Sequence, residues 1–316
     1  IDDGSTDRSW EILAEYAKAD ARILPIRQEN QGVSTARNNG IKKASGKYLI
    51  FMDPDDWYPE KDILEVLFEK AENSGCQICG GEFSEYNDRT GEVRTEFPEQ
   101  YFGYVFQKEG VIEYRDWQFD FGYHRFLYNR EFILEHQLYF PKLIRFQDPP
   151  FFVKAMITAE KFYAVKKVVY RYRYGHRDLK WTREKRIALL KGIYMDMDMA
   201  VRNHLERLVD LTWFRMTEEF GEIICCGIIE GETEIEEWIR RVYDCLEIDR
   251  KEKYGYPFYR RFRDEVILLK EKQRKEDERL ENEIKAIKNS ITFRVGKYLL
   301  YIPRCIKLAL WSRKKS

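Results

Sequence analysis

The feature that most constrains the fold is an apolar run, residues 48–52, that ends directly in three carboxylates, Asp53, Asp55 and Asp56. A continuous apolar run of this length predicts a buried strand. Carboxylates so close together repel one another unless a cation lies among them, and a hard divalent cation bridging to a phosphate takes oxygen ligands of this kind. The strand end therefore predicts a site for Mn²⁺ or Mg²⁺. The alternative is an acidic turn in which Asp55 or Asp56 caps the following helix.

Strand and helix patterns alternate on both sides of this run. Such alternation indicates crossover units with parallel strands and helices on both faces of the sheet. The expected helices cover 9–19, 34–44, 59–73, 130–136 and 149–160, and the expected strands cover 23–26, 48–52, 77–83 and 165–174. In open sheets of this kind, ligands bind beyond the carboxyl ends of the strands. We therefore expect an α/β fold whose site lies at the charged turns.

The length of 316 residues suggests about two domains. Helical spacing dominates from residue 181 onward. We expect an α/β domain over 1–180, a helical appendage over 181–265, and a charged helix with a basic tail over 266–316. Four apolar residues near the end of the charged helix form a short coiled-coil-like stripe, which predicts self-association through residues 266–291. The stripe consists of Leu280, Ile284, Ile287 and Ile291.

Charge is distributed unevenly along the chain. Lys and Arg together number 55, as do Asp and Glu, and this balance argues against a nucleic-acid-binding protein. Residues 291–316, however, hold seven basic residues and no acidic one, interleaved with apolar side chains. This composition predicts binding to an anionic membrane surface, and docking on the domain or on a partner is the alternative. No apolar run reaches the roughly 20 residues of a membrane-spanning helix.

A second acidic pair, Asp2 and Asp3, precedes a Gly-Ser turn and a helical pattern. A carboxylate at such a turn can accept a hydrogen bond from a base or a ribose hydroxyl. The alternative is a plain helix cap beside a tight glycine turn. Because the sequence opens directly on this turn, we expect an N-terminal segment to precede it.

A third block, residues 30–40, has the sequence NQGVSTARNNG. Its glycine predicts a turn, and the helix that follows carries Arg37 close to its start. An arginine at this place can meet a diphosphate. The alternative is an exposed arginine on an ordinary helix.

These three blocks, in this order, resemble the family-2 glycosyltransferases of the GT-A fold. The donor half of that family runs strand-DDGSTD-helix, then N-x-G-x-x-x-ARN-x-G, then strand-D-x-DD, and the resemblance extends from residue 1 to about residue 173. It implies a Rossmann-like mixed sheet with helices on both faces, and a nucleotide-sugar donor whose base is held by Asp3 with Asp2. It further implies that Asp53 contacts the ribose. Asp55, with Asp56 beside it, would hold Mn²⁺ or Mg²⁺ on the diphosphate. The family's sheet begins with an earlier strand that also contacts the nucleotide and is absent from this sequence.

Residues 145–152, RFQDPPFF, resemble the family's acceptor-side block, in which an acidic pair precedes a helix and one carboxylate is the catalytic base. Gln147 replaces one acid, which leaves Asp148 as the candidate base. In inverting transfer this carboxylate takes the proton of the acceptor hydroxyl as its oxygen attacks the anomeric carbon. The metal stabilises the departing nucleoside diphosphate. The alternative for Asp148 is a cap of the helix that begins at Pro149.

Two histidines are further candidates. His176 follows the last expected strand, from where it can reach the diphosphate or the metal. His124 can line the acceptor site. The alternative for both is a structural or solvent-exposed histidine.

The sequence therefore predicts a metal-dependent, inverting glycosyltransferase at the cytoplasmic face of a bacterial membrane. Its predicted partners are a nucleotide-sugar donor, a glycan or lipid-linked acceptor of a cell-surface polysaccharide, and the anionic lipid surface. Two alternatives stay open. One is a nucleotidyltransferase, which shares the chemistry of Asp, metal and nucleotide, and the other is a catalytically inactive sugar-binding or scaffold module.

Overall fold

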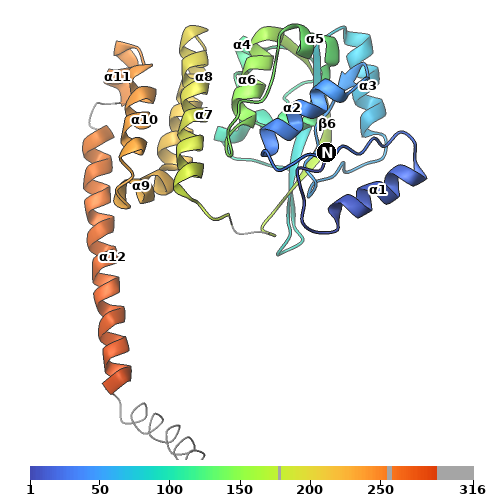
Figure 1. Cartoon of the computed structure of the whole chain (residues 1–316). Helices are drawn as coiled ribbons and strands as arrows, with labels where there is room; N and C mark the ends of the chain where they lie inside the picture. The colour runs from blue at the N-terminus through green and yellow to red at the C-terminus, as the bar shows by residue number, and fades with distance from the viewer. Residues whose placement is uncertain (177–178, 255–257, 290–316) are drawn as a thin grey trace, which may run out of the picture. The chain divides into compact units, whose positions relative to one another are not determined.

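The computed structural model describes residues 1–176, 179–254 and 258–289. The chain divides into two compact units, Ile1–Tyr254 and Gly255–Ser316. The first unit contains a sheet with its helices and a group of further helices (Figure 1). The described part of the second unit is a single helix.

Six strands form one mixed sheet in the first unit. They are β1 (Tyr48–Leu49), β2 (Ile78–Asn87), β3 (Val93–Arg94), β4 (Gly110–Glu113), β5 (Phe126–Asn129) and β6 (Lys161–Tyr174). Their order is β1-β5-β2-β6-β4, and β3 pairs with β2. Helix α3 (Ile63–Ser74) covers one face and α6 (Asp148–Ala159) the other (Figure 1). The expected α/β fold with helices on both faces is confirmed.

The alternation of strand and helix by itself predicts parallel strands, whereas the GT-A resemblance predicts a mixed sheet, and the mixed sheet is confirmed. Among the described strands, β2 and β6 run parallel and the other pairs run antiparallel. The expected strand over 23–26 is not formed, and Arg27, the residue after it, makes a single parallel bridge with Asp2. The expected strand over 48–52 shortens to β1, which pairs with two residues of β5.

The N-terminal helices agree well with the sequence pattern. Helix α1 (Ser9–Ala19) has the predicted bounds, and α2 (Val33–Lys43) starts one residue early, after Gly32. Helix α3 begins later than predicted and ends at Gly75, whose φ of 65° is the left-handed conformation that favours glycine at a helix end. Helix α5 (Arg130–Glu135) is capped by the side chain of Asn129.

The aromatic-rich stretch between β2 and β5 contains β4 and three short helices. These are η1 (Glu99–Tyr104), α4 (Tyr114–Trp117) and η2 (Tyr123–Arg125). Arg125 is buried, and its guanidinium donates to the carbonyls of Gly81 at 2.7 Å, Tyr104 at 3.3 Å and Gly103. A Cβ at Gly103 would lie only 2.2 Å from the ring of Phe119. Arg125 thus joins η1 to β2, and Phe119, in the segment after α4, packs closely on η1.

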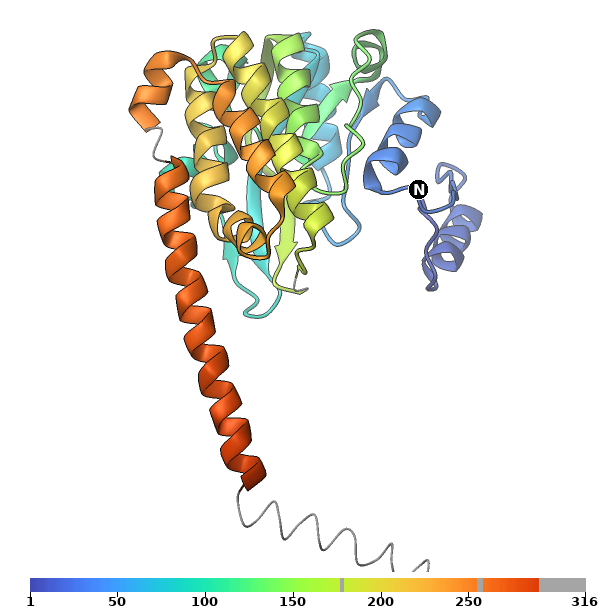
Figure 2. The same ribbon diagram turned by 60° about the vertical axis from the view of Figure 1, so that its left-hand side comes forward.

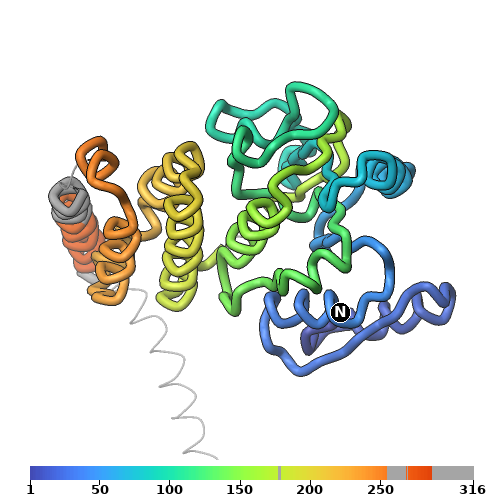
Figure 3. The backbone as a smooth tube through the Cα atoms, turned by 90° about the horizontal axis from the view of Figure 1, so that it is seen from above, coloured from blue at the N-terminus to red at the C-terminus, as the bar shows by residue number. Residues whose placement is uncertain are grey.

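A helical appendage follows β6. It consists of α7 (Arg183–Arg202), α8 (Glu206–Phe214), the π-helix η3 (Arg215–Glu219), α9 (Gly221–Ile229), α10 (Thr233–Asp244) and α11 (Ile248–Tyr254). Helix α7 packs against α6 and also against α8, α9 and α10, and Figures 2 and 3 show these helices gathered beside the α/β part. A Cβ at Gly192 in α7 would lie 2.4 Å from the carbonyl oxygen of Phe146. The appendage therefore rests directly on the loop before α6.

The described helix of the second unit is α12 (Phe258–Asn289), which includes the charged stretch. Leu280 and Ile284 of the predicted stripe are 51% and 49% exposed. Self-association through them stays a prediction, and Ile291 lies outside the described residues. The same holds for the tail 291–316, so its predicted membrane binding also stays a prediction. Among the helices that the structure describes, none combines the length and the hydropathy needed to cross a bilayer.

Candidate active site

One cavity gathers predicted site residues from distant parts of the chain. Its volume is about 390 Å³, and it is lined by Arg37, Asp53, His124 and Asp148. These side chains come from α2, the turn after β1, η2 and the start of α6. The α/β fold thus brings the predicted donor-side and acceptor-side residues together.

Arg37 and Asp53 form an ion pair in this cavity. The guanidinium Nη2 lies 2.6 Å from Asp53 Oδ1, and the hydroxyl of Tyr123 donates to the same oxygen at 3.2 Å. Burial disfavours the charge of Arg37, but Tyr123, Asp53 and Asp148 more than compensate, so the pKa of Arg37 is raised. Its Nη1 is buried without a hydrogen-bond partner among the described residues. This N–H group remains a donor for a ligand.

Asp148 is the first residue of α6, and the cap position before it belongs to Gln147. The structure therefore does not place Asp148 in the cap position that the alternative interpretation gave it. Burial raises the pKa of Asp148, and the nearby charge of Asp53 adds to the effect, whereas Arg37 and Arg145 oppose it. A raised pKa makes the carboxylate a stronger base.

The loop before Asp148 has a strained backbone. Phe146 has a φ of 57°, a left-handed conformation that a bulky residue rarely adopts. Its carbonyl packs on Gly192 of α7. Gln147, which stands where the family pattern has an acid, is buried, and its Oε1 finds no partner in the described part of the chain. Strain of this kind persists where the surroundings enforce it, and it is concentrated at functional sites.

The carboxylates that follow Asp53 have different surroundings. Asp56 is buried, and its oxygens accept from the hydroxyl of Tyr170 at 2.6 Å and from the amide of Arg173 at 2.8 Å. Burial raises the pKa of Asp56 to about 6 despite these two bonds. Asp55 is partly exposed, and its Oδ2 lies 3.0 Å from Nε2 of His176. Asp55 therefore has lone pairs available for a ligand, whereas both oxygens of Asp56 are already engaged.

Asp55 and His176 form the pair that best fits a divalent cation. Among the described residues, no three His, Cys, Asp or Glu side chains come close enough to hold a metal ion by themselves. Mg²⁺ commonly uses one or two protein carboxylates and completes its shell with phosphate oxygens and water. A ligating carboxylate is usually hydrogen-bonded by a neighbour, as Asp55 is by His176. The two residues fit a cation that binds together with a diphosphate.

Asp2 and Asp3 lie outside this cavity and contact their own part of the chain. Asp3 accepts from the amides of Gln31 at 2.9 Å and Gly32 at 2.8 Å, so it orders the turn before α2. Asp2 is buried and lies 3.3 Å from Nε of Arg27. The role of both residues toward a nucleotide base stays a prediction.

His124 is buried among aromatic rings. Its ring centre lies 3.9 Å from that of Tyr170 and 5.6 Å from that of Phe83. Burial lowers the pKa of His124 to about 3, so the imidazole is neutral at pH 7. Neither ring nitrogen bonds to any described residue. A neutral imidazole has one donor and one acceptor nitrogen, so His124 can bind a ligand hydroxyl.

Several site residues were missed by the motif reasoning. Tyr123 supports Arg37 and bonds Asp53, and its position next to His124 was the available signal. Tyr170 bonds Asp56, and Tyr172 lines the cavity. Both belong to the alternating sequence YRYRY at the end of β6, which places these tyrosines on one face of the strand.

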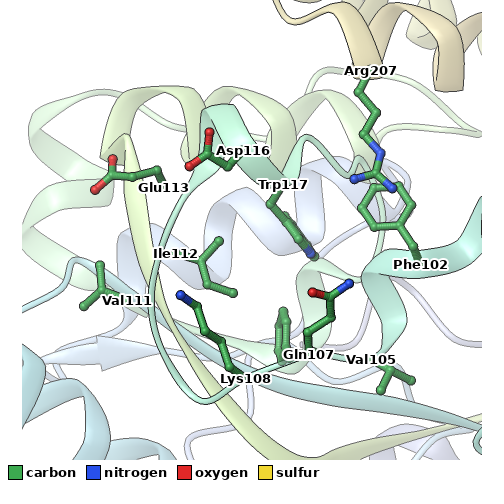
Figure 4. Close-up of a pocket in the computed structure, with 11 residues that line it drawn as sticks. Phe102, Val105, Gln107, Lys108, Val111, Ile112, Glu113, Asp116, Trp117 and Arg207 are labelled. Atoms are coloured by element: carbon green, nitrogen blue, oxygen red, sulfur yellow. The ribbon is translucent and has the colours of Figure 1, made fainter.

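A second cavity, of about 470 Å³, lies beside β4 (Figure 4). No predicted site residue lines it. Phe102 of η1 and Trp117 of α4 contribute rings, and the guanidinium of Arg207 lies 3.3 Å from the centre of the Phe102 ring. Tyr101, the neighbour of Phe102 on η1, lines the first cavity instead.

Comparison with known proteins identifies relatives of the α/β part. The profile of glycosyl transferase family 2 matches residues 1–136. The uncharacterized glycosyltransferase EpsJ of Bacillus subtilis is 38% identical over 180 residues, which cover 55% of this chain and 51% of EpsJ. The putative glycosyltransferase EpsH of the same organism is 33% identical over 185 residues, with coverage of 55% and 51%. The chain spans about half the length of these curated relatives.

A solved structure shares the fold over most of the chain. The crystal structure of S. aureus TarS 1–349 in complex with UDP-GlcNAc superposes with a TM-score of 0.62. The match covers 78% of this chain and 71% of that chain, at 15% sequence identity. At this identity the likeness establishes the fold.

Proposed function

Because residues 1–136 match glycosyl transferase family 2 and the chain has the GT-A fold, we propose that it transfers a sugar from a nucleotide-sugar donor to a glycan or lipid-linked acceptor. The observation that carries this proposal is the meeting of Arg37, Asp53 and Asp148 in one cavity. These residues come from three separate segments. Arg37 supplies positive charge for the diphosphate, Asp53 accepts a hydrogen bond from the ribose, and Asp148 is the general base. The relatives EpsJ and EpsH, both described as glycosyltransferases, support the reaction class.

On the donor side, Arg37 binds the diphosphate through Nη1, the guanidinium nitrogen that has no described partner. Asp53 accepts from the ribose, and Asp2 and Asp3 contact the base, as the family pattern implies. The TarS structure, which contains UDP-GlcNAc, supports a nucleotide-sugar ligand for this fold.

Asp55 would hold Mn²⁺ or Mg²⁺ at the diphosphate. His176 orients Asp55 through the contact at 3.0 Å and is the further candidate for a contact to the diphosphate. The ion, when bound, supplies positive charge that stabilises the leaving nucleoside diphosphate.

Asp148 acts as the general base of an inverting transfer. Its carboxylate takes the proton of the acceptor hydroxyl while that oxygen forms the new bond to the anomeric carbon and the diphosphate leaves. The raised pKa favours this role because a base works best when its pKa approaches the working pH. His124 contributes to the acceptor side through its unpaired ring nitrogens.

The same proposal assigns the chain to cell-surface polysaccharide synthesis at the inner face of the cell membrane. The basic and apolar composition of residues 291–316 supports contact with anionic lipid. Such contact confines the enzyme to the plane in which a lipid-linked acceptor lies. Flotation of the chain with phosphatidylglycerol vesicles at low salt, and its loss on deletion of 291–316, tests this part.

The test of the transferase activity offers the 316-residue chain a panel of nucleotide sugars with Mn²⁺ or Mg²⁺. We expect release of nucleoside diphosphate from at least one donor, and EDTA should abolish it. Asp116→Asn, in the second cavity, is the control for a carboxylate lost elsewhere. If no nucleoside diphosphate binds in calorimetry with either metal, the proposal is wrong.

A further inference from the structure

The cavity that contains Arg37, Asp53 and Asp148 has a second part, whose residues belong to none of the predicted motifs. Its residues come from the β2–β3 hairpin, from η1 and from the π-helix η3 of the appendage. They are Glu85, Arg94, Tyr101, Tyr104, Arg215 and Glu219. We call this set the hairpin–appendage wall.

The aromatic side of this wall is held in place before any ligand binds. The rings of Tyr101 and Tyr104 are stacked, with centres 5.6 Å and planes 5° apart. Tyr104 stacks in turn on Phe83 of β2, with ring centres 4.5 Å apart. Buried Arg125 donates to the carbonyl of Tyr104 at 3.3 Å. A ligand that packs on Tyr101 therefore binds with little loss of conformational entropy in the protein.

The appendage side is equally anchored. Arg215 is buried and bonds both oxygens of Asp120, which is fully buried. The same guanidinium pairs with Glu219 one turn along η3. A π-helical turn is rare and is found frequently at functional sites. Arg215 thus fixes the carboxylate of Glu219 at the cavity.

The charges of the whole cavity balance. Four arginines line it, Arg37, Arg94, Arg145 and Arg215, and so do four carboxylates, Asp53, Glu85, Asp148 and Glu219. Within the wall, Nε of Arg94 donates to Glu85 at 2.9 Å, and Arg215 pairs with Glu219. An anion at the wall would therefore meet two carboxylates along with two guanidinium groups, whereas Nη1 of Arg37, in the other part of the cavity, has no described partner. A hydroxyl both donates and accepts, so it can bond the carboxylate and the guanidinium of one pair.

Resting on the proposed function, we propose that the hairpin–appendage wall binds an uncharged, polyhydroxylated sugar unit of the acceptor. The sugar ring packs on Tyr101, and its hydroxyls bond the Arg94–Glu85 pair and Glu219. The C–H bonds of a sugar ring are polarised by the neighbouring oxygens, so their hydrogens are attracted to the negative face of an aromatic ring. The unit bound in this way shares the cavity with Asp148, the candidate base.

The experiment measures binding of small probes to the 316-residue chain in the presence of UDP and Mg²⁺. The neutral probes are the methyl β-glycosides of glucose, galactose and N-acetylglucosamine, and the anionic probes are methyl β-glucuronide and glycerol phosphate. Saturation-transfer NMR reports contact, and titration gives the dissociation constants. We expect at least one neutral glycoside to bind more tightly than both anions.

Tyr101→Ala and Phe102→Ala form a matched pair, because both residues are half-buried neighbours on η1 and face different cavities. Tyr101→Ala should weaken the neutral glycoside roughly 3- to 10-fold, the worth of one aromatic contact, and Phe102→Ala should leave it unchanged. Arg94→Ala, at an exposed ion pair, should weaken it as well, without loss of thermal stability. UDP affinity should be the same in all three variants.

Tighter binding of the anions, or equal effects of Tyr101→Ala and Phe102→Ala, would overturn the assignment of this wall. Binding of UDP without any neutral glycoside would overturn it too and leave the proposed function intact. Failure of the unaltered chain to bind any nucleoside diphosphate would instead contradict the proposed function.

Discussion

The two parts of the cavity differ in how completely their polar groups are paired. In the motif part, Nη1 of Arg37, both nitrogens of His124 and Oε1 of Gln147 are buried without described partners. In the hairpin–appendage wall, Arg94 and Arg215 each have a carboxylate partner. Buried polar groups are normally hydrogen-bonded, to protein, water or ligand. In our proposals the unpaired groups bond ligands at the reacting centre, Arg37 on the donor side and His124 on the acceptor side, whereas the paired wall holds a neutral sugar unit.

The largest effect is expected for Asp148→Asn, which replaces the candidate base in the cavity that both parts share. Turnover should fall by roughly 10²–10⁴-fold, the usual contribution of a positioned general base. Nucleotide affinity should not change, since the diphosphate contacts lie at Arg37 and Asp55. Steady-state kinetics and calorimetry on the same preparation make the comparison. Loss of nucleotide affinity in parallel with turnover would show that Asp148 belongs to the donor part instead.

The second test compares Asp55 and Asp56, two adjacent carboxylates in the turn that follows Asp53, outside the residues that line the cavity. Asp55→Ala should weaken metal-dependent nucleotide binding by roughly 10- to 100-fold, on the scale of lost metal-site interactions, and leave the melting temperature nearly unchanged. Asp56→Ala should leave metal-dependent nucleotide binding nearly unchanged and lower the melting temperature. It leaves the hydroxyl of Tyr170 and the amide of Arg173 without their acceptor, at a cost of about 1–3 kcal/mol in unfolding free energy.

Calorimetry with Mn²⁺ or EDTA and a thermal melt separate the two variants. If Asp56→Ala removes the metal dependence and Asp55→Ala does not, the assignment of the ligand is reversed.

The motif part could be predicted from the sequence because its residues lie in short blocks. The apolar run before Asp53 and the glycine turn before Arg37 each define their own local structure. The same sequence could not tell Asp55 from Asp56, since both are carboxylates in one turn. Only the packing of β6 against that turn buries Asp56 under Tyr170 and leaves Asp55 partly exposed.

The hairpin–appendage wall could not be predicted in the same way. Tyr101 and Glu219 are far apart in the sequence and meet because η1 and η3 pack around the same cavity. No local period or spacing marks either residue. Strand β5 was not expected for a related reason: its antiparallel pairing with β2 joins segments on either side of a long insertion, which no local pattern reveals.

The contact between α7 and the loop before α6 gives the third test. Gly192→Ala should cost about 1–3 kcal/mol of unfolding free energy, because the added Cβ would lie 2.4 Å from the carbonyl of Phe146 and overpacks that site. Turnover should fall while nucleotide affinity stays, since the displaced loop carries Asp148. Gly221→Ala is the control, because its Cβ would meet nothing closer than 3.9 Å. Equal melting temperatures for the two variants would show that the loop before α6 moves away from the added Cβ without loss of stability, which would contradict the prediction.

The smallest effect concerns Arg145, whose charge favours the ionised form of Asp148 and opposes the effect of burial. A base must be deprotonated to act, so turnover falls as pH drops through the pKa of Asp148, which lies above its ordinary value. Arg145→Gln removes a positive neighbour, raises this pKa further and moves the acidic limb of the pH profile to higher pH. We expect a shift of less than about one pH unit, because one unit corresponds to roughly 1.4 kcal/mol and the interaction is partly screened. Arg145→Lys keeps the charge and should leave the limb in place. A limb that stays in place in Arg145→Gln, or moves to lower pH, would mean that the group titrating in turnover is not Asp148.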